Sequence, residues 1–232
     1  MRCRPSRPGR RPLGRYDYPT KFRVFEVVSL AFFAVCFVVF GLRILNEVSD
    51  RFAVEVIGGV LVVGFLAFVT ADFLSGLVYF LCDNLGTSDT PVLGQKFIKA
   101  FREHHDDPVG MTDGDFIEVN ADNFFVCLPV LVPSIVWLDV HRHVYLAAYL
   151  AVLMVFVAIT NEVHKWAHMV EVPSALQRLQ RTPLFLASEM HQRHHTAPYD
   201  SYYCITSGVL NPVLTRTHFW QGLLRVCRRS RQ

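Results

Sequence analysis

The chain has 232 residues, of which 52% are hydrophobic and 19% are charged, and its formal net charge at pH 7 is +3. Soluble domains carry about 25% charged residues, so this composition argues against an ordinary soluble protein and favours a membrane protein. The small net charge, with arginines concentrated at the two ends of the chain, does not support nucleic-acid binding.

The N-terminal segment is basic and contains no acidic residue in its first 15 positions. Its six arginines are Arg2, Arg4, Arg7, Arg10, Arg11 and Arg15. We interpret residues 1–20 as a cytosolic tail drawn to anionic lipid head groups, and an organelle transit peptide is the alternative for such an acid-poor segment. Residues 226–232 form a second basic tail, which leaves residues 21–225 as the membrane domain.

Four apolar stretches follow the N-terminal tail. They cover residues 24–42, residues 56–71 with a continuation through 73–82 after Asp72, residues 124–138 and residues 144–159. A helix that spans a bilayer needs about 20 residues, with a range of about 17–25. The first two stretches meet this length, whereas the last two lie close to its lower limit, so a buried core hairpin is the alternative for that pair. We predict an all-α membrane protein with about four transmembrane helices and a cap of short helices.

The distribution of positive charge predicts the orientation of these spans. Both ends of the chain are rich in arginine, whereas the connections after the first and third spans hold little positive charge, with Arg51 in one and Arg142 in the other. By the positive-inside rule both termini face the cytosol, which requires an even number of spans. Residues 83–122 and 160–232 then lie on the cytosolic side, while His141 and His143 lie on the other.

Eight of the ten histidines fall in these two cytosolic segments, and seven of these eight are grouped. These seven form three groups: His104-His105, His164-x-x-x-His168 and His191-x-x-His194-His195. Residues spaced i, i+3 and i+4 lie on one face of a helix, so the second and third groups should each point their imidazoles in one direction. Neutral imidazole is the commonest metal ligand among side chains, and seven nitrogens exceed the four ligands of one zinc ion. The pattern suits two metal ions, with iron among the candidates.

Two of the groups also have simpler interpretations. A His-His pair beside acidic residues is typical of a solvated surface. Because adjacent helical side chains diverge by about 100°, His104 and His105 could also serve different metals. His164 and His168 beside Trp166 fit the aromatic belt of a membrane interface as well as a metal clamp.

Several polar residues near these groups carry separate expectations. Asn161 and Glu162 could orient imidazoles or hold a metal-bound water. Asp72 interrupts an apolar stretch, where an ionisable group is functional by default, but its position near the cytosolic interface fits a structural role equally well. Gly76 allows another element to approach closely. His218 lies apart from the groups and is interpreted as an ordinary interfacial residue.

Five motifs carry a resemblance to a known family. They are Thr70-Ala-Asp-Phe-Leu-Ser-Gly76, Phe101-Arg-Glu-His-His105, His164-Lys-Trp-x-His168, His191-x-x-His-His195 and Tyr203-Cys-Ile-Thr-x-Gly208. Over roughly residues 60–220 the chain resembles the CarF/Kua family of membrane proteins, which includes plasmanylethanolamine desaturases.

The resemblance implies an oxygen-dependent lipid desaturase of the endoplasmic-reticulum membrane, with a plastid or other organelle membrane as the alternative. It implies two iron ions held by the seven grouped histidines, which would activate molecular oxygen to remove hydrogen from an unactivated chain. The implied substrate is the alkyl or acyl chain of a membrane phospholipid, above all plasmanylethanolamine, whose product is the vinyl ether of a plasmalogen. Electrons would come from a cytochrome b5-type donor.

The chain departs from the family pattern at Tyr79 and Tyr199, where the family has histidines. Tyrosine can ligate iron as a phenolate, so both are weaker candidates for the metal site, together with the retained Asp83 and with Asn161. If both family histidines are ligands, this centre has lost two nitrogen donors. A non-catalytic membrane scaffold of the Kua type is therefore a competing function, and a membrane lipid hydroxylase is another.

Overall fold

The computed structural model describes residues 18–51, 53–91 and 93–229. The regular secondary structure of these residues is helical, with no strand among them. The four predicted spans correspond to α1 (Thr20–Asp50), α2 (Val54–Asn84), α4 (Phe116–Trp137) and α5 (Val144–His168). All four are long and apolar enough to cross a membrane. The all-α prediction with four spans is therefore confirmed, including the second pair, whose helices extend to 22 and 25 residues.

The predicted tails are only partly covered by the described residues. Residues 1–17 and 230–232 lie outside them, and this includes the six N-terminal arginines and Arg231. Residues 226–229 form the last turn of α9 (Phe219–Arg229), so the helix continues beyond the predicted start of the second tail at residue 226.

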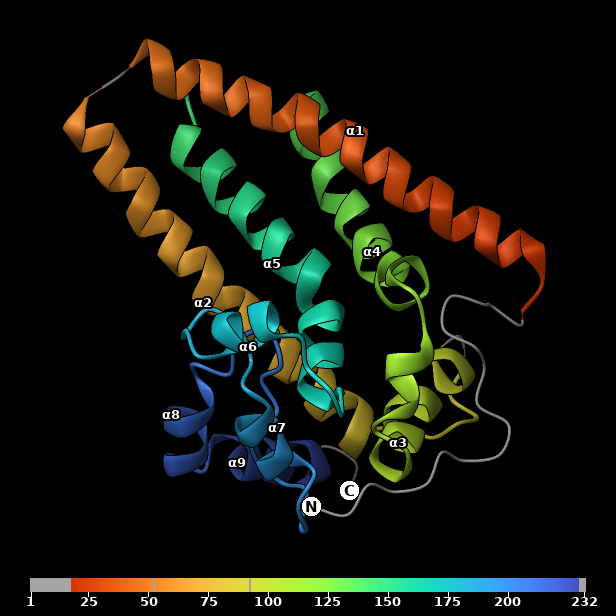
Figure 1. Ribbon diagram of the computed structural model, residues 1–232. Helices are drawn as coiled ribbons and strands as arrows, with labels where there is room; N and C mark the ends of the chain where they lie inside the picture. Colours follow the sequence, from red (N-terminus) through yellow and green to blue (C-terminus); the bar gives the residue numbers. More distant parts are fainter. Residues whose placement is uncertain (1–17, 52, 92, 230–232) are drawn as a thin grey trace.

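The long helices pack in the order α2, α5, α4, α1, because the closest helix pairs are α2 with α5, α5 with α4 and α4 with α1 (Figure 1). The remaining helices gather at one end of this bundle and form the cap. They are η1 (Gly94–Ile98), α3 (Lys99–Asp106), η2 (Gly110–Asp113), α6 (Ser174–Gln180), α7 (Ser188–His194), α8 (Asn211–Arg216) and α9.

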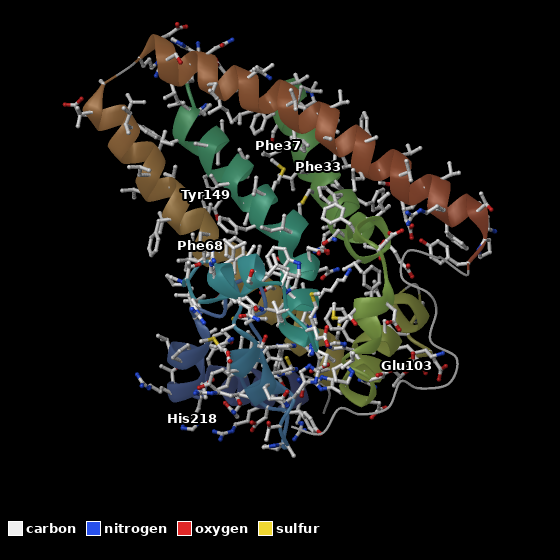
Figure 2. All side chains as sticks on the ribbon, in the orientation of Figure 1. Phe33, Phe37, Phe68, Glu103, Tyr149 and His218 are labelled. Carbon is white, nitrogen blue, oxygen red and sulfur yellow. The ribbon has the colours of Figure 1, made fainter. Side chains whose placement is uncertain are left out.

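The outer surface of the bundle is apolar, as a lipid-facing surface must be. Val35, Leu61 and Phe65 are each more than 60% exposed, a pattern that would be a liability in water but suits hydrocarbon. Between the helices, aromatic side chains fill the core: the Phe33 ring meets Phe124 edge-on at 5.0 Å between centroids, and Figure 2 shows Phe33 at the junction of α1 and α4.

Two polar contacts show which ends of the long helices lie together. At the cap end, the Arg23 guanidinium donates to both carboxylate oxygens of Asp115 at 2.9 and 2.6 Å, and Asp115 also accepts from the Glu118 N–H at the start of α4. At the other end, Arg51 donates to the carbonyl of His141 at 2.5 Å. The start of α1 and the start of α4 therefore share the cap end, whereas the two short connections meet at the opposite end.

Asp72 has a structural role in this fold. Its buried carboxylate accepts hydrogen bonds from the backbone N–H groups of Ser207 and Gly208 at 2.8 Å each, and of Leu210 at 3.0 Å. Gly76, one turn further along α2, lets the same segment approach, because a Cβ there would lie 2.6 Å from Cys204 Sγ. These contacts tie the segment between α7 and α8 directly to α2.

Aromatic packing completes the attachment of the cap. Trp220 of α9 is fully buried and stacks on Phe80 of α2 at 5.3 Å and on Phe73 at 6.3 Å. Tyr203 packs edge-on against both Phe80 and Trp220. The cap is therefore a packed extension of the bundle, which allows it to hold side chains in defined positions.

Candidate metal centre

The structure brings the seven grouped histidines together with one carboxylate in two neighbouring sets. The first set is His104, His164, His168, His191 and His195, and the second set is Asp83, His105 and His194. Within each set, one ligand atom of every residue lies within 4.8 Å of the others. The donors come from the ends of α2, α3 and α5 and from α7, so the site exists only when the cap is folded on the bundle.

The first set brings five ring nitrogens into close contact. The Nε2 atom of His191 lies 2.8 Å from that of His164, 2.8 Å from that of His168 and 3.1 Å from that of His195. His164 and His168 occupy one face of the last turn of α5, as their i, i+4 spacing predicted. Both His164 and His191 are buried, so water does not satisfy these nitrogens.

Hydrogen bonding alone cannot satisfy this arrangement. The Nε2 atoms of His104, His164 and His168 form a triangle with sides of 3.1, 3.0 and 3.2 Å. Each neutral Nε2 either carries a proton or offers a lone pair. Two of the three must share the same state, so at least one side of the triangle faces two donors or two acceptors. A cation that accepts several lone pairs resolves the conflict, because neutral imidazole binds metal through such a nitrogen.

The electrostatic environment keeps these histidines neutral. Burial, followed by the charge of neighbouring imidazoles, lowers the pKa of His104 to about 3 and that of His195 to about 2. The same causes hold the pKa of His191 well below its usual range. Since metal ligation requires unprotonated imidazole, the first set is ready to bind a cation at neutral pH.

The second set combines two imidazoles with a carboxylate. Asp83 Oδ2 lies 3.0 Å from His105 Nε2 and 3.5 Å from His194 Nε2. The Nδ1–H of His194 donates to the Ser201 carbonyl at 2.9 Å, which directs the Nε2 lone pair of the neutral ring toward the set. His194 Nε2 and Asp83 Oδ1 are buried and have no hydrogen-bond partner among the described residues.

These donors fit two metal ions. The first set offers five nitrogens, and the second offers two nitrogens and a carboxylate oxygen. Imidazole and carboxylate together suit iron as well as other first-row metals. A pocket of about 310 Å³ adjoins the second set alone, lined by Asp83, Asn84, Arg102, His105, Pro198, Tyr199 and Tyr203. Small molecules would therefore reach the second set more directly.

The prediction that the three histidines of His191-x-x-His194-His195 point in one direction is wrong. His191 and His195 join the first set, whereas His194 turns to the second. The reason is that α7 ends at His194, and adjacent side chains at a helix end diverge by about 100°, so His194 and His195 face different sets. His104 and His105 divide between the sets in the same way, in agreement with their helical geometry.

Asn161 and Glu162 make their hydrogen bonds away from the grouped histidines. Asn161 Nδ2 donates to the Val119 carbonyl at 3.1 Å, which joins α5 to α4. Glu162 accepts from the Trp166 indole N–H at 2.8 Å and from Asn120 at 2.9 Å. Among the described residues neither side chain is hydrogen-bonded to an imidazole, and their roles in orienting imidazoles or holding a metal-bound water stay predictions.

The two tyrosines differ in their relation to the centre. Tyr79 is fully buried and its ring lies 4.6 Å from that of His194 between centroids. Tyr199 is 44% exposed at the rim of the pocket, with its ring 5.3 Å from that of His105. His218 lies at the edge of the cap, away from both sets, as Figure 2 shows.

The sequence analysis did not identify the Ser201 carbonyl, which accepts the hydrogen bond from His194, because a backbone acceptor leaves no signal in the sequence.

Fold and site together define a four-helix membrane protein with a histidine-rich candidate metal centre in its cap. A family model described as the lipid desaturase domain matches residues 68–230, which is more than half of the chain. The chain therefore belongs to the lipid desaturase domain family, and the resemblance seen in its motifs is confirmed.

Relatives with curated names agree with this family. The chain is 40% identical over 156 residues to plasmanylethanolamine desaturase of Myxococcus xanthus and 39% identical over 165 residues to plasmanylethanolamine desaturase 1 of Mus musculus. These matches cover 67% of this chain in both cases, and 56% and 60% of the two relatives. It is 29% identical over 163 residues, 69% of this chain and 49% of the relative, to chloroplastic fatty acid desaturase 4 of Arabidopsis thaliana. No solved structure matches.

Proposed function

We propose that this chain is an oxygen-dependent desaturase of a membrane phospholipid, and that it converts plasmanylethanolamine into the vinyl ether of a plasmalogen. The observation that carries the proposal is the pair of donor sets, five and three residues, at one end of a membrane-spanning bundle. The names of the Myxococcus xanthus and Mus musculus relatives support this particular substrate.

The balance of hydrogens and electrons in desaturation determines what the proposed metal centre must do. Desaturation removes two hydrogens from adjacent carbons of the alkyl chain and reduces one O₂ to two waters, which consumes two further electrons and two protons. Two iron ions, when bound, would supply the oxygen activation that an unactivated C–H bond requires. The two electrons must come from outside, and a cytochrome b5-type protein is the proposed donor.

The chain's own residues prepare the centre for this task. Neutral His191 and His195 offer lone pairs to a cation at physiological pH. The hydrogen bond from His194 Nδ1 to Ser201 holds that ring in the tautomer that faces the second set. Asp83 brings one negative charge to a set that otherwise contains neutral donors.

The location of the centre fits a lipid substrate. His164 and His168 occupy the last turn of α5, a helix whose preceding residues are apolar enough to cross a membrane. A chain attached near the glycerol of a phospholipid lies close to such a helix end. We propose the endoplasmic-reticulum membrane with both termini cytosolic, in keeping with the positive-inside rule, and a plastid or other organelle membrane as the alternative.

The test is expression of the chain in cells that make 1-O-alkyl phospholipids but no vinyl ethers, followed by mass spectrometry of the lipids. We expect a product two hydrogens lighter than the alkyl lipid. Replacement of His164, His168, His194 or His195 by alanine should abolish that product, whereas His143→Ala, at the opposite end of the bundle, should retain it.

Each competing function has its own outcome in this experiment. A product that gains one oxygen would identify a hydroxylase. The absence of product from a membrane-inserted protein that binds no iron would favour the scaffold. Product formation that survives the His194→Ala/His195→Ala double substitution would overturn the proposed centre.

A further inference from the structure

Tyr79 is a buried phenol without a polar partner. Tyr79 belongs to α2 and its side chain is fully buried. Among the described residues its hydroxyl makes no hydrogen bond. Burial of a hydroxyl without a partner costs free energy, so a buried tyrosine usually finds one. The hydroxyl of Tyr79 therefore requires an explanation that the protein atoms do not supply.

The ring of Tyr79 lies between the two donor sets. Its centroid is 4.6 Å from that of His194 and 6.0 Å from that of His105, which belong to the second set. It is 5.7 Å from the ring of His164 and 6.3 Å from that of His191, which belong to the first. All four contacts are edge-on, so the phenol is enclosed by candidate ligands.

Tyr79 also shares a helix face with a member of the second set. Asp83 lies four residues further along α2, and side chains at i and i+4 are neighbours on a helix surface. The second set has only three donors, and its Asp83 Oδ1 and His194 Nε2 lack partners. A fourth donor from the same face of α2 would complete a four-ligand set.

Tyr203 provides a comparison inside the same site. Its ring is 4.9 Å from that of His194, almost as close as the ring of Tyr79. Its hydroxyl, however, donates to the Tyr199 carbonyl at 2.9 Å and accepts from Asn84 Nδ2 at 3.1 Å. Of these two tyrosines, only Tyr79 has an oxygen left for a metal.

We propose that Tyr79 is a metal ligand, and that its phenolate oxygen binds the cation held by Asp83, His105 and His194. The inference rests on the proposed function, because it requires a metal centre. When the oxygen–metal bond forms, the phenol O–H bond breaks and the proton leaves to solvent, with no change of oxidation state. The first set would then contain only nitrogen donors, so the two metals would differ spectroscopically.

The test is visible absorption and resonance Raman spectroscopy of the purified full chain, loaded with ferrous iron and then oxidised to the ferric state. A ferric phenolate gives a ligand-to-metal charge-transfer band and enhances tyrosine ring vibrations. We expect the band in the wild type and in Tyr203→Phe, and its complete loss in Tyr79→Phe. Tyr79→His should lose the band yet retain two irons per chain, because a nitrogen donor replaces the oxygen.

The outcomes separate this inference from the proposed function. Two bound irons without a charge-transfer band would overturn the assignment of Tyr79 and leave the metal centre intact. A band that persists in Tyr79→Phe would also overturn it. A protein that binds no iron would overturn both the assignment and the proposed function.

Discussion

The Nε2 atoms of His164 and His191 lie 2.8 Å apart although 27 residues separate the two histidines in the chain. His164 lies one turn before the end of α5, a helix apolar enough to span a membrane, and His191 belongs to a seven-residue helix of the cap. The contact therefore shows that the cap packs back against the end of the bundle. The candidate metal centre therefore forms only when the cap is docked on the bundle.

The division of the histidines into two sets makes single substitutions distinguishable. We expect His191→Ala to remove a ligand of the first set and His194→Ala to remove a ligand of the second, so each should lower iron content by about one ion per chain. Metal analysis of the purified variants measures this. Loss of both irons in each variant, with the protein still folded, would mean that the two sets do not bind metal separately.

Asp72 should matter for stability and not for metal ligation. Its carboxylate accepts three backbone hydrogen bonds, and bonds to a charged group contribute roughly 1.5–3 kcal/mol each. We expect Asp72→Ala to lower the free energy of unfolding by about 3 kcal/mol or more, measured by thermal unfolding in detergent. Asp89→Asn, at an exposed position after α2, is the control and should unfold like the wild type. An unchanged unfolding temperature in Asp72→Ala would show that the segment between α7 and α8 is held by other contacts.

Asn161→Ala should preserve the metal centre. The amide donates to the Val119 carbonyl of α4, so its removal should cost about 1 kcal/mol of stability and leave iron content at the wild-type level. Iron content and unfolding temperature, measured on the same preparation, decide between this structural role and the role predicted from the sequence. A loss of iron without loss of stability would favour the latter.

The ion pair between Arg23 and Asp115 predicts a pH dependence. The hydrogen bonds from Arg23 lower the pKa of Asp115 below its ordinary value of about 3.9, so the ionised form is favoured in the folded state. The stabilisation is therefore complete above about pH 4 and is lost as the pH falls through the lowered pKa.

The matching variant is Asp115→Asn, which keeps a good helix N-cap but removes the charge. We expect it to be less stable than the wild type by about 1 kcal/mol at pH 7, and this difference should shrink toward zero in strong acid. Unfolding temperatures compared at pH 7 and below pH 4 measure it. A difference that stays constant across this range would exclude the ion pair as its source.

The spans could be predicted from the sequence because apolar length alone determines which segments cross a bilayer. The gathering of seven histidines at one end also followed, since charge bias places residues 83–122 and 160–232 on one side. The division into two sets did not follow, because it depends on how the ends of α2, α3 and α5 meet α7 in the folded protein. The role of Asp72 was equally inaccessible, since its partners are backbone N–H groups more than 130 residues away.

Asn161 illustrates the limit of proximity in sequence. It precedes His164 by three residues, a spacing that favours one helix face, yet α4 supplies the acceptor that fixes its side chain. Tyr79 shows the opposite case. Its ring lies at the centre of the site, and its buried hydroxyl without a partner among the described residues could be recognised only once its neighbours were known.

The most direct test of the metal centre is the iron content of the detergent-purified full chain beside that of the His194→Ala/His195→Ala double variant. The double substitution removes one ligand from each set, so both metals should be affected. The account predicts about two irons per chain in the wild type and loss of both in the variant. Substoichiometric iron that is the same in the two proteins would contradict it.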